Sequence, residues 1–213
     1  MTQQFFAQVA LDDESSKGGY GIGLQIGQQL LESQLNVKAE AVAKGIYDVL
    51  NHNQPAIELT EIEKALQSLQ QQATEAMQAK FKEIDAAGKA FLAEQAKKEG
   101  VKVTDSGLQY EVLTEGTGAV PTADSKVRVH YTGTLPDGTV FDSSVTRGQP
   151  AEFPVKGVIP GWVEALTMMP VGSKWKLNIP QELAYGERGA GQVIPPYSPL
   201  VFEVELLDIL DAE

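Results

Sequence analysis

The sequence predicts an α+β protein in which an N-terminal helical module precedes a C-terminal antiparallel sheet that carries one short helix. Apolar residues recur at helical spacing from Tyr20 until a glycine at position 100. Beyond that glycine, short alternating runs are separated by turns rich in glycine and proline. The 213 residues also exceed the length of a usual single domain, about 100–150 residues. We therefore expect two domains, residues 19–100 and 101–213.

The first residues of the chain are polar and show no period. Residues 1–18 end in a run of serine, lysine and glycine, and we expect them to form a flexible arm. The next stretch places Tyr20, Leu24 and Leu31 on one helical stripe. It also contains several glycines, each of which costs an isolated helix about 1 kcal/mol. This helix therefore needs tertiary support.

Two further helices are predicted. Residues 38–50 form a short amphipathic segment that ends before Pro55. A continuous apolar stripe then predicts a linker helix over about residues 60–99, which would be roughly 60 Å long. Such a helix outruns a small domain, so we expect a homodimer formed through residues of about 19–55 and the start of the long helix. A monomeric helical bundle is the alternative.

The C-terminal domain reads as strands and turns. Alternating patterns predict strands at residues 126–133, 174–179 and 200–207, with a turn at residues 135–139. In the last strand, apolar and acidic residues occupy opposite faces. A short helix fits residues 161–168.

Charge and composition exclude several classes of protein. Acidic side chains outnumber basic ones by 29 to 17, for a formal net charge of -12, so we expect no nucleic-acid partner. No apolar run approaches the roughly 20 residues of a membrane span, so we expect no membrane insertion. Residues 1–16 lack the basic start of a secretory signal. A cytoplasmic location is expected, and a periplasmic one only if a signal peptide was removed.

Reactive side chains are few. Cysteine is absent, which excludes a disulfide framework, a thiolate nucleophile and a cysteine-based zinc site. His52 lies in a polar turn and His130 on a predicted strand, so we expect neither a metal cluster nor a Ser-His-Asp set. Gly186, Gly189 and Gly191 lack the Lys-Ser/Thr that follows in a phosphate loop. The sequence therefore predicts no metal and no cofactor.

The second half is instead rich in aromatic residues. A domain of this size needs about half of them for its core. The remainder predict an apolar pocket. These aromatic residues are Tyr131, Phe141, Phe153, Trp162, Trp175, Tyr185, Tyr197 and Phe202.

Six motifs in this half resemble the FKBP family of peptidyl-prolyl cis-trans isomerases in order and approximate spacing, over about residues 105–210. The helical leader and its long helix resemble the two-domain, Mip-like bacterial subgroup, whose leader domains dimerise. The motifs are Val129-His130-Tyr131-Thr132-Gly133, Asp137-Gly138-Thr139-Val140-Phe141-Asp142-Ser143-Ser144, Val158-Ile159-Pro160-Gly161-Trp162, Ala184-Tyr185-Gly186, Ile194-Pro195-Pro196 and Leu200-Val201-Phe202-Glu203-Val204-Glu205-Leu206-Leu207.

The resemblance implies an antiparallel half-barrel wrapped around the short helix, with a proline pocket above Trp162. The backbone N–H of Ile159 and the Tyr185 hydroxyl would hold substrate carbonyls. Asp142 would approach the carbonyl that precedes proline, with Arg147 as its ionic partner. The residues implied to line or border the pocket are Tyr131, Phe141, Phe153, Val158, Ile194 and Phe202.

The implied activity is isomerisation of X-Pro bonds in unfolded or partly folded polypeptides, with macrolide FKBP inhibitors as ligands and chaperone-like client binding by the dimer. The alternative is a non-catalytic chaperone or a macrolide-type ligand-binding module. The chain departs from the family pattern at Ala151 and Ala190, where small members often carry an aromatic residue and a histidine. The loop at residues 147–158 is also about two residues shorter. We expect one pocket wall to be more open.

Overall fold

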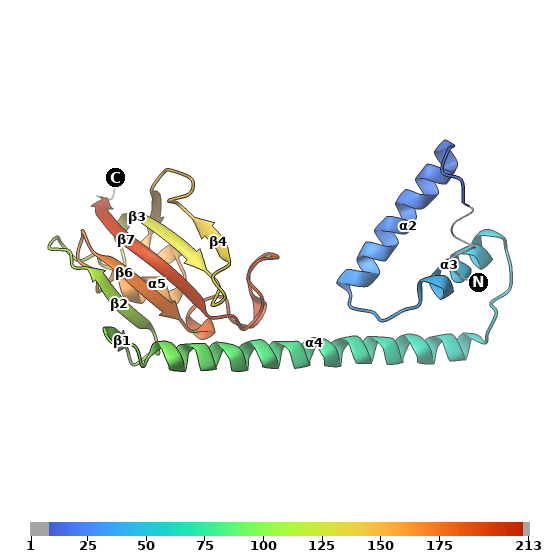
Figure 1. Ribbon diagram of the computed structural model, residues 1–213, viewed down its shortest axis with the longest axis horizontal. Helices are drawn as coiled ribbons and strands as arrows, with labels where there is room; N and C mark the ends of the chain where they lie inside the picture. Colours follow the sequence, from blue (N-terminus) through green and yellow to red (C-terminus); the bar gives the residue numbers. More distant parts are fainter. Residues whose placement is uncertain (1–8, 211–213) are drawn as a thin grey trace. The chain divides into compact units, whose positions relative to one another are not determined.

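The computed structural model describes residues 9–210 and divides into two compact units, Met1–Ala79 and Lys80–Glu213 (Figure 1). The division falls inside the longest helix, α4 (Leu59–Gln95), whereas the sequence placed a domain boundary at residues 100 and 101. The second part of α4 therefore belongs to the same unit as the sheet.

Helix α2 (Glu14–Glu32) begins earlier than the sequence analysis expected. Asp13 caps it, because its carboxylate accepts hydrogen bonds from the Ser16 backbone N–H at 2.9 Å and from the Ser16 hydroxyl at 2.6 Å. Residues 14–18 are thus helical, and the prediction of a flexible arm is wrong for them. Residues 1–8 of that predicted arm lie outside the described residues.

The two other helices follow the expected order. Helix α3 (Ala39–Leu50) matches the second amphipathic segment, and α4 matches the long linker helix. Helix α4 ends at Gln95 and not near residue 99, because the amides of Lys97 and Lys98 bond to carbonyls three residues back and tighten the last turn. Within residues 9–210, no helix combines the length and apolar character needed to cross a bilayer.

The N-terminal unit has almost no interior of its own. Neither α2 nor α3 contains a buried residue, and in residues 9–79 Ala73 alone is buried. Large apolar side chains on these helices stay in solvent, including Tyr20, Leu24 and Leu31, which is 74% exposed. An amphipathic helix gains most of its stability when its apolar face is covered. Within one chain, the apolar faces of α2 and α3 stay uncovered.

The C-terminal unit is built on one antiparallel sheet (Figure 1). Its order is β1-β2-β6-β7-β3-β4, and β5 also pairs with β3. The sequence analysis identified β3, β6 and β7 but named no strand at β1, β2, β4 or β5, and of these four β1, β4 and β5 are short. The strands are β1 (Val101–Val103), β2 (Gln109–Thr114), β3 (Lys126–Thr134), β4 (Val140–Ser143), β5 (Ala151–Pro154), β6 (Lys174–Ile179) and β7 (Leu200–Leu210).

Strand alternation places the core on one face of this sheet. In β7, the side chains of Leu200, Phe202, Val204 and Leu206 are buried while those between them are more exposed, as the sequence pattern predicted. The short helix α5 (Pro160–Leu166) packs on this face and buries part of its surface there. Its start at a proline follows the usual preference for proline in the first turn.

Candidate active site

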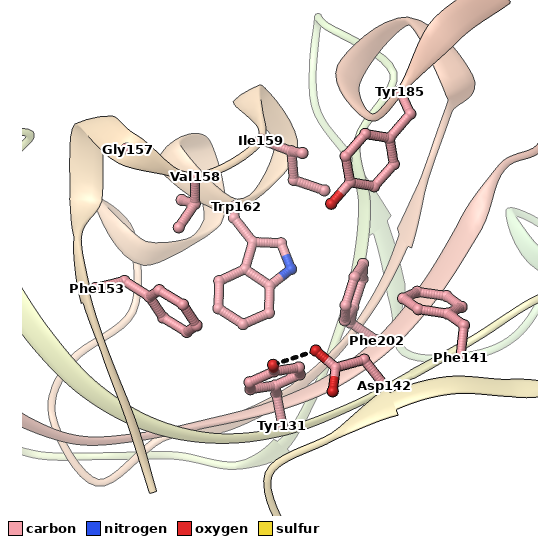
Figure 2. Close-up of a pocket in the computed structure, with 10 residues that line it drawn as sticks. All are labelled: Tyr131, Phe141, Asp142, Phe153, Gly157, Val158, Ile159, Trp162, Tyr185 and Phe202. Carbon is pink, nitrogen blue, oxygen red and sulfur yellow. Dashed lines mark hydrogen bonds between the residues drawn. The ribbon is translucent and has the colours of Figure 1, made fainter. Parts of the chain in front are cut away.

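A hollow of about 440 Å³ opens beside α5 in the C-terminal unit (Figure 2). Most of its lining is aromatic or aliphatic, and Asp142 supplies the one carboxylate. A concave apolar site with few polar groups is the usual form of a ligand pocket. The lining residues are Tyr131, Phe141, Asp142, Phe153, Gly157, Val158, Ile159, Trp162, Tyr185 and Phe202.

Trp162 forms the base of this hollow because α5 holds it against the sheet, and it is 4% exposed. Three rings meet the indole close to edge-on. Their centroids lie 5.2 Å away for Tyr131, 5.8 Å for Phe153 and 5.2 Å for Phe202, with interplanar angles of 84°, 90° and 81°. Edge-to-face contacts are favourable for aromatic pairs, so the rings lock each other into an open box.

Gly133 of β3 makes room for two of the walls. A β-carbon at this position would lie 2.6 Å from the Phe141 ring and 2.7 Å from the Phe202 ring. Those two rings pack edge-on at a centroid distance of 5.4 Å. The glycine therefore lets both rings lie against the strand at the mouth of the pocket.

The single carboxylate is held by two donors. The Tyr131 hydroxyl donates to Asp142 Oδ2 and the Arg147 guanidinium donates to Asp142 Oδ1, while Arg147 Nη2 donates to the Tyr131 hydroxyl at 3.0 Å (Figure 2 shows the Tyr131 bond). Burial opposes ionisation of Asp142, but these hydrogen bonds and the Arg147 charge lower its pKa below the ordinary value. Burial, and then the hydrogen bond to Asp142, raise the pKa of Tyr131.

Two donors at the rim stay available. Within residues 9–210, no group accepts a hydrogen bond from the backbone N–H of Ile159, which precedes the first turn of α5. The Tyr185 hydroxyl likewise forms no hydrogen bond within the described part of the chain, and the residue is 41% exposed. Figure 2 shows this hydroxyl directed into the hollow, on the same side as Ile159. Both groups can donate a hydrogen bond to an acceptor on a bound molecule.

The indole N–H of Trp162 also lacks an acceptor in the described residues. The indole nitrogen is itself buried. The base of the pocket therefore offers an aromatic surface in place of a polar contact. In the described residues, no group of three or more histidine, cysteine, aspartate or glutamate side chains is placed to hold a metal.

Two family models match the chain. FKBP-type peptidyl-prolyl cis-trans isomerase matches residues 118–207, and the domain amino terminal to that isomerase matches residues 15–112. The FKBP-type 22 kDa peptidyl-prolyl cis-trans isomerase of Escherichia coli K12 is 58% identical over 200 residues, covering 93% of this chain and 97% of that protein. The chain belongs to the FKBP-type peptidyl-prolyl cis-trans isomerase family.

Other members of the FKBP family resemble most or part of the chain. FkpA of Aeromonas hydrophila is 48% identical over 91% of this chain and 75% of that protein. The crystal structure of FkpA from Escherichia coli has a TM-score of 0.76 at 36% identity, covering 96% of this chain and all of the other. A peptidyl-prolyl isomerase structure from Pseudomonas syringae has a TM-score of 0.58 at 45% identity, covering 61% of this chain and 96% of the other. The FKBP fold and its helical leader domain are thereby confirmed.

The structure brings together most of the residues that the FKBP resemblance pointed to. All of them line the pocket except Arg147, which reaches it through Asp142, and Ile194. Ile194 is buried in the core cluster, and its backbone pairs with Ala190. Sequence reasoning missed Gly157, which has no side chain and is marked only by its place before the Val158-Ile159-Pro160 motif.

The two departures from the FKBP pattern lie outside the pocket lining. Ala151 lies in β5 opposite Val129, and Ala190 pairs with Ile194. Neither side chain contributes to the surface of the hollow. The expectation that one pocket wall is more open because of these two alanines therefore stays a prediction.

Proposed function

We propose that this chain accelerates rotation about X-Pro bonds by seating the proline ring on Trp162 and holding the flanking carbonyls. The aromatic box around Trp162 is the observation that carries the proposal. Its rings enclose a space of apolar character above the indole, with polar groups confined to the rim. The direct test is whether the folded protein speeds a refolding reaction that is limited by proline isomerisation.

The chemistry needs no nucleophile and no bond cleavage. Rotation is slow because the planar amide must lose its resonance, at a barrier of about 18–20 kcal/mol. A twisted amide has less charge separation than a planar one, so an apolar pocket favours the twisted state. Lowering the barrier by about 5–7 kcal/mol gives four to five decades in rate. Preorganised contacts are sufficient for an effect of this size.

The polar groups at the rim of the pocket have separate roles in the proposed mechanism. Ile159 and Tyr185 donate hydrogen bonds to carbonyls beside the rotating bond and so hold the twisted chain in place. Asp142 faces the carbonyl that precedes proline, and its two donors keep the carboxylate fixed and charged. Arg147 acts through Asp142 and is a positioning residue.

Asp142→Asn tests the carboxylate. The substitution keeps the size of the side chain but removes its charge, so we expect kcat/KM for isomerisation to fall about tenfold, which corresponds to about 1.4 kcal/mol. The matched control is Asp124→Asn, which removes the same charge from an exposed ion pair with Lys156. Equal activities in the two variants would remove Asp142 from the mechanism.

The pH dependence follows from the directions of the two pKa shifts. Asp142 has a lowered pKa and Tyr131 a raised one, so neither changes its charge near neutrality. We expect kcat/KM to vary less than about twofold between about pH 5 and 9 in a protease-free assay on a peptide without titratable groups. A bell-shaped profile with a midpoint inside that range would indicate acid-base chemistry and contradict the proposal.

The same shift predicts how stability depends on pH. The folded-state pKa of Asp142 lies below its unfolded value of about 3.9, so its contribution is fully present above that value. The contribution is lost as the pH falls through the folded-state pKa.

We also propose that the N-terminal unit pairs two copies of the chain. Its apolar side chains lack a core, and a groove of about 360 Å³ runs between α2 and α3. Glycine and aliphatic residues make up its lining, among them Gly23, Ile26 and Leu30. A second copy supplies the same apolar helices and covers both sets at once.

Sedimentation tests this pairing. We expect a species of twice the 23.0 kDa chain mass at micromolar concentration. Leu31→Glu should raise the dimer dissociation constant at least about tenfold, because it places a charge in the covered face. Val120→Glu, at an exposed site in the C-terminal unit, is the control. A wild-type chain that sediments as a single copy would refute the pairing.

Chaperone-like binding of clients is a second proposed role, for which the candidates are those apolar side chains of the N-terminal unit that a second copy leaves uncovered. Aggregation suppression should survive loss of isomerase activity and disappear when residues 1–55 are deleted. The opposite result would assign client binding to the catalytic pocket. The cytoplasmic location stays a prediction, which cell fractionation would test.

A further inference from the structure

The second part of α4 packs against the loop that carries Tyr185. This loop, residues 184–199, runs from the end of η2 (Gln181–Leu183) to the start of β7. The rings of Phe81 and Tyr197 lie 5.7 Å apart at an angle of 45°. A small cavity of about 20 Å³ lies at this contact, lined by Gly88 of the helix and by Tyr197 and Pro199 of the loop among others.

Gly88 is the point of closest approach. A β-carbon at this position would lie 2.7 Å from Pro199 Cδ and 3.1 Å from Pro199 Cγ. The proline ring is closed onto the backbone, so it cannot swing aside as a flexible side chain does. Any side chain at position 88 therefore displaces either the helix or the backbone of the loop.

The helix has little freedom to move. The side chain of Gln109 in β2 donates a hydrogen bond to the Leu92 carbonyl at 2.8 Å and is itself buried. Its oxygen accepts a hydrogen bond from buried Asn178 at 3.4 Å. These hydrogen bonds hold the end of α4 against the sheet. A side chain at position 88 would therefore move the loop and not the helix.

Backbone hydrogen bonds within the loop couple the position of Tyr197 to that of Tyr185. Tyr197 has a left-handed backbone, with φ of 63°, which a residue with a side chain adopts only when contacts hold it there. Its amide donates to the Gly186 carbonyl at 2.9 Å, directly beside Tyr185. Ala190 and Ile194 exchange backbone hydrogen bonds of 2.9 and 3.1 Å across the loop.

We propose that Phe81 and Gly88 of α4 are positioning residues for Tyr185, acting through Tyr197 and Pro199. The proposal rests on the proposed isomerase function, in which the Tyr185 hydroxyl holds a substrate carbonyl. The second part of α4 then belongs to the catalytic unit and helps to shape the pocket.

Gly88→Ala tests the proposal, because the expected change in kcat is opposite to the expected change in helix stability. Alanine favours helix formation over glycine, so the substitution strengthens the intrinsic preference of α4. We nevertheless expect kcat to fall about fivefold, the size expected for one misplaced hydrogen bond, with KM changed less than about twofold. Ala90→Leu, on the opposite side of the helix and exposed, should keep the wild-type rate.

A double-mutant cycle separates positioning from general damage. If Gly88→Ala acts through the Tyr185 hydroxyl, it should cost nothing further once Tyr185→Phe has removed that hydroxyl. Phe81→Ala should behave in the same way, and Phe81→Leu should recover at least half of the lost rate. Multiplicative losses in Gly88→Ala/Tyr185→Phe, or a wild-type rate in Gly88→Ala, would overturn the positioning role. Absence of acceleration by the wild-type chain would instead overturn the proposed function.

Discussion

Trp162→Ala should lower kcat/KM for prolyl isomerisation about 100-fold, because it removes the surface on which the proline ring rests. The same change deletes a buried side chain that three other rings contact, so the free energy of unfolding should fall by about 3–5 kcal/mol. Denaturant unfolding and a refolding assay measure the two effects separately.

Trp162→Leu guards against a variant that does not fold. It keeps an apolar base of smaller area, and we expect activity to fall about tenfold with a stability loss of about 1–3 kcal/mol. Trp175→Leu is the matched control, because the other tryptophan is equally buried but stacks on Tyr110, away from the pocket. If Trp175→Leu lost as much activity as Trp162→Leu at equal stability, the indole at position 162 would have no special role.

Gly133→Val should lower kcat/KM about 30-fold and destabilise the fold by about 1–3 kcal/mol. The added side chain overlaps the rings of Phe141 and Phe202. The strand cannot retreat, because Gly133 pairs with Asp142 on one side and with Phe202 on the other. Both walls and the carboxylate are displaced together, so activity should fall more than stability alone explains.

Thr132→Val is the control for Gly133→Val. It places a valine at the preceding position, where the side chain lies on the opposite face of β3. It removes one hydroxyl contact with Ser143, and Thr132 does not line the pocket. Gly133→Ala serves if the valine variant does not fold. A wild-type rate in Gly133→Ala would contradict the clearance argument, since its single added carbon already overlaps both rings.

The sequence predicted secondary structure best where one period continues over many residues. The stripe of α4 and the alternation of β7 are such cases, and both appear in the structure. Short strands such as β1, with three residues, carry too little pattern to identify alone. The start of α2 was missed because the glycines that follow have a low helix propensity. The side chain of Asp13 caps the helix and stabilises its first turn.

The candidate site was predicted mainly from motifs, and the structure explains where that reasoning stops. Residues of one motif stay neighbours in the fold, so Ile159 and Trp162 both reach the pocket. Ile194 does not line it, because its loop folds back on itself through the bridge to Ala190. A motif specifies a residue type at a position, and the path of the loop decides which way that residue faces.

The sequence by itself determined the helical leader, the long helix, the positions of three strands along the chain and the aromatic residues available for a pocket. Only the tertiary structure decided that Gly133 clears space for two rings and that Gly88 meets Pro199. The physical reason is that periodicity and local chemistry are encoded between near neighbours in the chain. Clearances depend on side chains that are far apart in sequence, and only packing brings them within contact distance.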